Sequence, residues 1–159
     1  MLLPQTRKEE TQMLFGEYRH TLDAKNRVSI PSKLRDELGE NFMIVRSIRG
    51  NSLRFYSAEA WEKYIEPLKA LPRKDMEKFF LFIYRDATQT TPDSLGRVLL
   101  PTGMLSYIGA GAKPEEGNRN LVIVGCGDYG EIWAEDKYAE YVDSMDLGEI
   151  RDVLEANGL

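Results

Sequence analysis

Histidine and cysteine are almost missing from this sequence of 159 residues, since each occurs once, as His20 and Cys126. Zinc sites built from several His and Cys ligands are therefore excluded, and an internal disulfide has no second cysteine. A Cys–His catalytic dyad would rest on this single pair. Because Cys126 lies in an apolar run, we expect a small buried hydrophobe there rather than a nucleophile. We expect His20 to be an ordinary, half-exposed strand residue.

Long apolar runs are also missing. No segment approaches the roughly 18 apolar residues that a membrane-spanning helix needs. The first 12 residues lack the hydrophobic segment of a signal peptide. No glycine-rich phosphate loop of the Walker or Rossmann kind occurs. We therefore expect a cytoplasmic protein that has no membrane association, no metal site and no cofactor.

Basic residues are fewer than acidic ones, 21 against 26, and the net charge is −5. That sign at first argues against a nucleic-acid partner. However, residues 140–159 contain six acidic residues and one basic residue, which accounts for the whole excess. Residues 13–35 contain five basic and two acidic residues. An acidic C-terminal segment thus conceals a locally basic N-terminal half.

A short motif, Asp-x-x-x-Arg followed four residues later by Pro, occurs twice. It lies within HTLDAKNRVSIPSKL (20–34) and within TPDSLGRVLLPTGML (91–105). At an offset of 70 residues the Asp, Arg, Val and Pro are identical, and further apolar and aromatic residues correspond at offsets of 79 and 77. Nine extra residues in a Gly/Pro/Glu-rich loop at 110–119 change the offset from 70 to 79, and the loss of two residues before position 131 changes it to 77. This is the pattern of a duplicated half-domain.

We divide the chain accordingly. The expected segments are an N-terminal extension (1–12), a first repeat (13–71), a connecting helix (72–87), a second repeat (88–142) and an acidic C-terminal helix (143–159). Each repeat is predicted to run strand, turn, strand, short helix, strand, strand, helix. Ser32 and Thr102, which follow the prolines, are predicted to cap the short helices, and Ser57 the longer helix of the first repeat. These elements predict an α+β fold.

The turn residues of the motif have predictable roles. Asn26 and Gly96 occupy the position that needs a positive φ, which these two residue types adopt most easily. Asp23 and Asp93 begin the turns, where a carboxylate can accept hydrogen bonds from backbone N–H groups. For one copy alone, a turn-stabilising Asp with a solvated Arg would be a sufficient explanation.

Two copies favour a binding surface. If the halves pack about a local twofold axis, both loops are displayed symmetrically, with Thr21, Lys25 and Arg27 on the first and Thr91 and Arg97 on the second. Cations and hydroxyls on rigid hairpin loops suit contacts with phosphates and insertion into a DNA groove. An aspartic-protease dyad is disfavoured, because neither Asp is followed by the Ser/Thr-Gly which that site needs, and an Arg four residues on would hold each Asp ionised. We expect no catalytic residues.

The stretch MLFGEYRHTLDAKNRVSIPSKLRDELG (13–39), the second DSLGRVLLP and the late EIW (131–133) resemble the MraZ family of bacterial transcriptional regulators. The resemblance implies a double-split β-barrel of the AbrB/MazE/MraZ kind, with two SpoVT-AbrB-like halves and peripheral helices. It also implies a ring-shaped homo-oligomer, an octamer or a dodecamer. The expected DNA contacts carry over onto Lys25, Arg27 and Arg97.

The implied function is transcriptional regulation. The expected partner is double-stranded DNA with repeated boxes upstream of the division and cell-wall gene cluster, where the protein represses its own operon at the nucleoid. Met13 matches the usual start of the family, so residues 1–12 are either an extension or the product of a misread upstream start codon, and the 110–119 loop is longer than expected. The alternative keeps the fold but makes the chain an AbrB-like antitoxin or protein-binding module, whose acidic tail occupies a basic partner.

Overall fold

The computed structural model describes residues 13–159, so the expected N-terminal extension (1–12) lies outside the described residues. The first half contains β1 (Glu17–Thr21), β2 (Arg27–Ser29), α2 (Ser32–Leu38), β3 (Phe42–Arg46), β4 (Ser52–Ser57), α3 (Ala58–Ile65), the 3₁₀ helix η1 (Glu66–Ala70) and α4 (Arg73–Tyr84). The second half contains β5 (Thr88–Thr90), β6 (Arg97–Leu99), α5 (Thr102–Tyr107), β7 (Asn120–Gly125), β8 (Gly130–Ala134), α6 (Glu135–Asp143) and α7 (Leu147–Ala156). The α+β class is therefore confirmed.

The strands form two antiparallel sheets. Six of them make one sheet in the order β1-β7-β8-β4-β3-β5, and β2 and β6 form a separate two-stranded ribbon. The outermost strands of the large sheet pair across the halves, because β1 adds to β7 and β5 adds to β3. Neither half completes its part of the sheet without the other.

The two halves are related by a local twofold axis. In the ribbon, Val28 pairs with Val98, its own equivalent at the 70-residue offset. In the large sheet, Arg54 pairs with Glu131, its equivalent at the 77-residue offset. Equivalent residues can face each other in an antiparallel ladder only where the twofold axis passes between them. The axis therefore runs through both sheets, at these two pairs.

The main core lies between the large sheet and the ribbon, with α2 and α5 closing it. Its centre combines ribbon residues with sheet residues that are almost wholly buried, among them Val28, Ile30, Val98, Leu100, Phe55, Leu121 and Ile132. A second, smaller core forms where α3 and α4 pack on the sheet around Tyr56, Trp61 and Ile83. The inward-facing valines thus hold the thin ribbon against a well-packed sheet.

The prediction that Ser32 and Thr102 cap the short helices is wrong. Pro31 and Pro101 hold the N-cap positions, and neither helix has a side-chain cap. The Pro31 carbonyl instead accepts the N–H groups of Leu34 and Arg35, so Ser32 already lies in the first turn. Each proline has a ψ angle in the extended range and is followed directly by the first helical residue. The strand therefore ends and the helix begins within one residue. The Ser57 cap is confirmed, because its side chain accepts the N–H of Ala60 at 3.0 Å.

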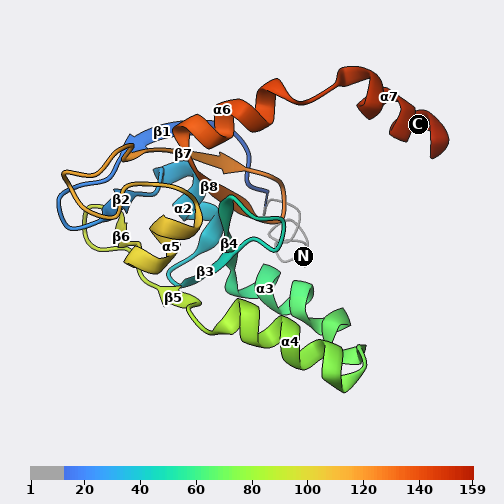
Figure 1. Cartoon of the computed structure of the whole chain (residues 1–159). Helices are drawn as coiled ribbons and strands as arrows, with labels where there is room; N and C mark the ends of the chain where they lie inside the picture. The colour runs from blue at the N-terminus through green and yellow to red at the C-terminus, as the bar shows by residue number, and fades with distance from the viewer. Residues whose placement is uncertain (1–12) are drawn as a thin grey trace, which may run out of the picture.

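The arrangement separates the ribbon from the long helices (Figure 1). The β2–β6 ribbon lies at the left of the view, whereas α3 and α4 lie at the lower right. Helix α6 runs along the sheet and α7 projects away from the body at the upper right. Within residues 13–159, none of the helices has the length and apolar character needed to cross a bilayer.

Candidate nucleic-acid interface

The first motif forms a closed turn organised by one carboxylate. Asp23 Oδ1 accepts the backbone N–H groups of Lys25 and Arg27, both at 2.9 Å. Its Oδ2 accepts the Nε–H of Arg27 at 2.8 Å. The backbone closes the same turn, since Asp23 N–H donates to the Arg27 carbonyl and Asn26 N–H to the Asp23 carbonyl. The Arg27 side chain is thereby held in one orientation.

The second motif repeats this bonding. Asp93 accepts the N–H groups of Leu95 and Arg97 and the Nε–H of Arg97, each at 2.9 Å. The position before each arginine is left-handed, with φ of 61° at Asn26 and 80° at Gly96. The carbonyls of Asn26 and Gly96 accept the N–H groups of Leu100 and Ile30 of the other copy. The two turns are therefore fixed to each other as well as internally.

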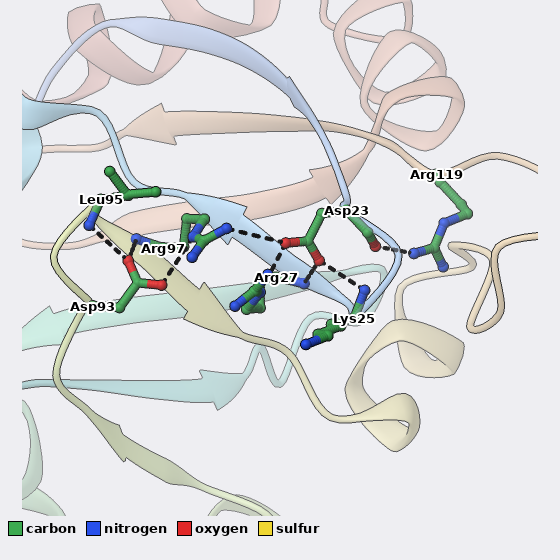
Figure 2. A network of polar contacts seen from close by, with 7 residues as sticks. All are labelled: Asp23, Lys25, Arg27, Asp93, Leu95, Arg97 and Arg119. Atoms are coloured by element: carbon green, nitrogen blue, oxygen red, sulfur yellow. Dashed lines mark hydrogen bonds and ion pairs between the residues drawn. The ribbon is translucent and has the colours of Figure 1, made fainter.

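Both arginines lie on the outward face of the ribbon. Paired residues in an antiparallel ladder share a face, and Arg27 pairs with Leu99 while Arg97 pairs with Ser29. Val28 and Val98 point the other way and are buried. Figure 2 shows Asp23 in contact with both arginines, with Arg97 Nη1 3.8 Å from Asp23 Oδ2. The ribbon thus places two oriented guanidinium groups side by side across the local axis.

The electrostatics follow from these contacts. Burial tends to raise the pKa of Asp23, but the hydrogen bonds from Arg27 and Lys25 outweigh it and lower that pKa. The N–H of Arg97, followed by those of Leu95 and the Arg97 side chain, lowers the pKa of Asp93. Both carboxylates are therefore ionised at neutral pH. A dyad that shares a proton cannot form from them.

The remaining predicted residues differ in what they offer. Lys25 is exposed, and its backbone N–H alone is used by the turn. Thr21 is exposed at the end of β1, where its hydroxyl donates to Asn120 Oδ1 at 2.8 Å. Thr91 makes the equivalent bond to Asn41 Oδ1. Each threonine therefore anchors the strand that leads into a loop, and its oxygen remains free to accept a further hydrogen bond.

Arg119 was not predicted from the sequence as a functional residue, and it supports the first loop from the side opposite the ribbon's outward face. Its guanidinium donates to the Asp23 carbonyl and, at 2.9 Å, to the Gly111 carbonyl (Figure 2). Asn26 Nδ2 donates to Ala112 in the same segment at 3.1 Å. The 110–119 loop therefore braces the first turn. The sign of this brace in the sequence was the insertion at 110–119, because the second copy of the repeat otherwise aligns with the first.

Arg35, on α2, was also not predicted as a functional residue. Its Nε donates to the Ile30 carbonyl at 2.8 Å. Its guanidinium lies so close to Gly96 that a Cβ at that position would be 2.6 Å from Arg35 Cζ. Arg35 therefore packs against the second turn, as Arg119 packs against the first.

The expectation that Cys126 is buried is wrong, because the residue is exposed just before the turn between β7 and β8. Strand β7 ends at Gly125, so Cys126 begins the connecting turn and does not continue the buried strand. Its sulfur still lies partly against protein, which together with the negative charge of Glu131 raises the pKa of the thiol to about 11. The thiol is protonated at neutral pH and is a poor nucleophile. In the described part of the chain, no group of three His, Cys, Asp or Glu residues is placed to hold a metal ion.

Comparison with known proteins gives a consistent result. The family model described as "MraZ protein, putative antitoxin-like" matches residues 13–80. The chain is 35% identical to "Transcriptional regulator MraZ" of Clostridium tetani over 150 residues, which cover 92% of this chain and all of the relative. It is 37% identical to the protein of that name in Caldanaerobacter subterraneus subsp. tengcongensis, covering 85% of this chain and 90% of the relative. It is also 37% identical to the protein of that name in Oenococcus oeni, covering 81% of this chain and 86% of the relative.

Proposed function

The chain belongs to the MraZ family, and on that premise we propose that it is a transcriptional regulator that binds double-stranded DNA through the outward face of the β2–β6 ribbon. One observation carries the proposal: Arg27 and Arg97 lie together on that face, each oriented by an ionised aspartate. A two-stranded antiparallel ribbon fits the major groove of B-DNA. The family is one of regulators and not a class of enzymes.

The bonding of the arginines suits base or phosphate recognition. Each aspartate engages Nε, which fixes the plane of the guanidinium. Among the described residues, the terminal nitrogens of Arg27 have no hydrogen-bond partner, so they can make the bidentate contact that arginine forms with guanine or with a phosphate. The two aspartates therefore orient the arginines, but each aspartate also neutralises part of the positive charge of its arginine.

The two loops contribute unequally. The first loop presents the exposed Lys25 beside Arg27, whereas the equivalent position in the second loop is Leu95, which is 66% exposed. Lys25 adds a mobile charge that can follow the phosphate backbone. Leu95 adds no charge but can contact the apolar edge of a base. We propose that the first loop supplies more of the electrostatic binding.

The finer proposal concerns target and assembly. We propose that the protein recognises repeated boxes upstream of the division and cell-wall gene cluster and represses its own operon at the nucleoid. We also propose that the six-stranded sheet and the ribbon are the two parts of a double-split β-barrel, and that several copies close into a ring. A chain whose net charge is −5 gains from such a ring, because many loops then face the DNA together at high effective concentration.

The test is a titration of the full chain against its own upstream region, cut to contain one, two or three of the repeats found there, at two salt concentrations. Adding a second correctly spaced repeat should raise the affinity about tenfold or more. Affinity should fall steeply with salt, because each docked Lys or Arg releases condensed counterions. The double variant Arg27→Ala/Arg97→Ala should lose specific binding while keeping its circular dichroism spectrum. Equal affinity for all three fragments together with no salt dependence would overturn the proposal and favour a protein-binding module.

A further inference from the structure

Leu99 is an exposed leucine on the outward face of the ribbon. Its side chain is 56% exposed, whereas the other apolar residues of the two ribbon strands, Val28 and Val98, are almost wholly buried. An antiparallel sheet with one face in water normally has polar residues on that face. The other outward residues of β2 and β6 follow this rule, since they are two arginines and a serine. Packing within the chain therefore does not explain the leucine.

The equivalent residue of the other copy is Ser29, so the outward face is not symmetric. The local axis relates Ser29 to Leu99, just as it relates the two arginines to each other. A serine hydroxyl can donate or accept a hydrogen bond and can contact any base. A leucine side chain can do neither. Both ends of the ribbon thus have an arginine, but the residue beside the arginine is polar at one end and apolar at the other.

Leu99 lies directly across the ribbon from Arg27. In the adjoining pair, the N–H of Leu100 donates a ladder hydrogen bond to the carbonyl of Asn26. Hydrogen-bonded and non-hydrogen-bonded pairs alternate along an antiparallel ladder, so Arg27 and Leu99 form a non-hydrogen-bonded pair, the kind in which facing side chains are closest. The Cβ atoms of such a pair are about 5 Å apart. The leucine therefore accompanies the oriented guanidinium of Arg27 wherever that group binds.

This spacing suits neighbouring bases in DNA. Successive base pairs are about 3.4 Å apart along the helix, so a side chain about 5 Å from Arg27 reaches a base pair one or two steps from the position of that arginine. In the major groove, the apolar group that distinguishes one base from the others is the C5-methyl group of thymine. An exposed leucine on a ribbon in this groove can bind that group and no polar base edge.

We propose that Leu99 is a specificity-determining residue that packs on the C5-methyl group of a thymine one or two base pairs from the position of Arg27. The inference rests on the proposed binding of DNA by the ribbon, and it adds a base that the arginines do not select. Ser29 makes no such contact beside Arg97, so thymine is selected on one side of the local axis only. An apolar contact releases no counterions, so this selection is independent of salt although the total affinity is not.

The test removes the methyl group and the leucine separately and together. The full chain is titrated by fluorescence anisotropy with a duplex that carries one repeat from its own upstream region, and with duplexes in which each thymine in turn is replaced by deoxyuridine. In the wild type, one replacement should weaken binding about fourfold, the effect expected for one buried methyl group. Leu99→Ser should bind the thymine duplex about fourfold more weakly and should bind the deoxyuridine duplex equally well. Leu99→Met, which keeps an apolar side chain, should still prefer thymine.

The matched control is Leu159→Ser, because Leu159 is 83% exposed and lies at the C-terminus. This control should keep the wild-type affinity and the full thymine preference. Leu99→Ser should keep the circular dichroism spectrum and the urea midpoint of the wild type, since the leucine side chain is largely in water. The thymine preference of the wild type should be the same at two salt concentrations, while its affinity for both duplexes falls at the higher one.

Three results would overturn parts of this account. If no deoxyuridine replacement weakens binding by the wild type, or if Leu99→Ser keeps the wild-type preference, the inference is wrong. A preference that is lost in Leu95→Ser but kept in Leu99→Ser would also overturn it, because the methyl group would then contact the second loop. A wild type that binds none of the duplexes would instead overturn the proposed DNA binding itself, which is a separate and distinguishable result.

Discussion

Arg97 Nη1 lies 3.8 Å from Oδ2 of Asp23, the carboxylate of the other motif. That carboxylate also accepts the Nε–H of Arg27 at 2.8 Å. Asp23 therefore serves both arginines of the ribbon, whereas Asp93 is paired with Arg97 alone among the described residues. The two loops are coupled through one residue, so changes at Asp23 should affect both.

The first prediction concerns pH. The pKa of Asp23 is lowered in the folded protein, so its ionised form stabilises the fold above the unfolded-state pKa of about 3.9, and this contribution is lost as the pH falls through the lower, folded value. Asp23→Asn should lower the urea midpoint by the same amount at all pH values above about 5. The difference from wild type should then shrink below about pH 4. A difference that persists undiminished at pH 2 would contradict this assignment.

The second prediction concerns the arginines. Arg27→Ala should weaken binding to the upstream region at least as much as Arg97→Ala, because Arg27 acts beside Lys25. Loss of either should cost about tenfold in affinity, the range expected for one specific arginine contact. Fluorescence anisotropy measures both. Lys63→Ala on α3, far from the ribbon, is the control and should bind like wild type; equal loss in the control would indicate a non-specific charge effect.

The third prediction concerns the second turn. In Gly96→Ala the backbone keeps a φ of 80° and the new Cβ lies 2.6 Å from Arg35 Cζ. The backbone strain and the steric overlap with Arg35 should therefore both lower the free energy of unfolding. Gly127→Ala has a φ of 94° but no atom within 4 Å of the added Cβ, and it should show only the conformational cost of about 1–2 kcal/mol. Chemical denaturation should therefore show a larger loss for Gly96→Ala. Relief of that excess by Arg35→Ala in the same chain would confirm its cause.

Much of this could be predicted from the sequence, because the signals were local. The loops were specified by two features: a residue type that adopts positive φ before each arginine, and a carboxylate at the start of each turn. Alternating apolar residues specified the strands within a few positions. The bracing contacts could not be predicted in this way. Arg119 reaches Asp23 across 96 positions, and Arg35 reaches the second turn through tertiary packing alone. The sequence also carries no sign of which residue occupies the N-cap when a proline and a serine stand side by side.

The fourth prediction concerns the brace. Arg119→Ala removes the donors to the Asp23 and Gly111 carbonyls and should loosen the first turn only. Amide hydrogen exchange at residues 23–27 should become faster, while exchange at residues 93–97 should stay unchanged. DNA affinity should fall less than in Arg27→Ala, since no contact to the DNA itself is lost. Equal acceleration in both turns would show that the 110–119 loop supports the whole ribbon.

The pairing of Arg54 with Glu131 at 3.1 Å has a consequence for the origin of the chain. Two copies of the first half alone would set arginine against arginine at the axis, and two copies of the second half would set glutamate against glutamate. Shape reinforces charge, because the Phe55 ring fills the space that any side chain at Gly130 would need. The two halves are thus unlike partners at the axis, in charge and in shape. Expressed as separate polypeptides, the halves should prefer each other to themselves.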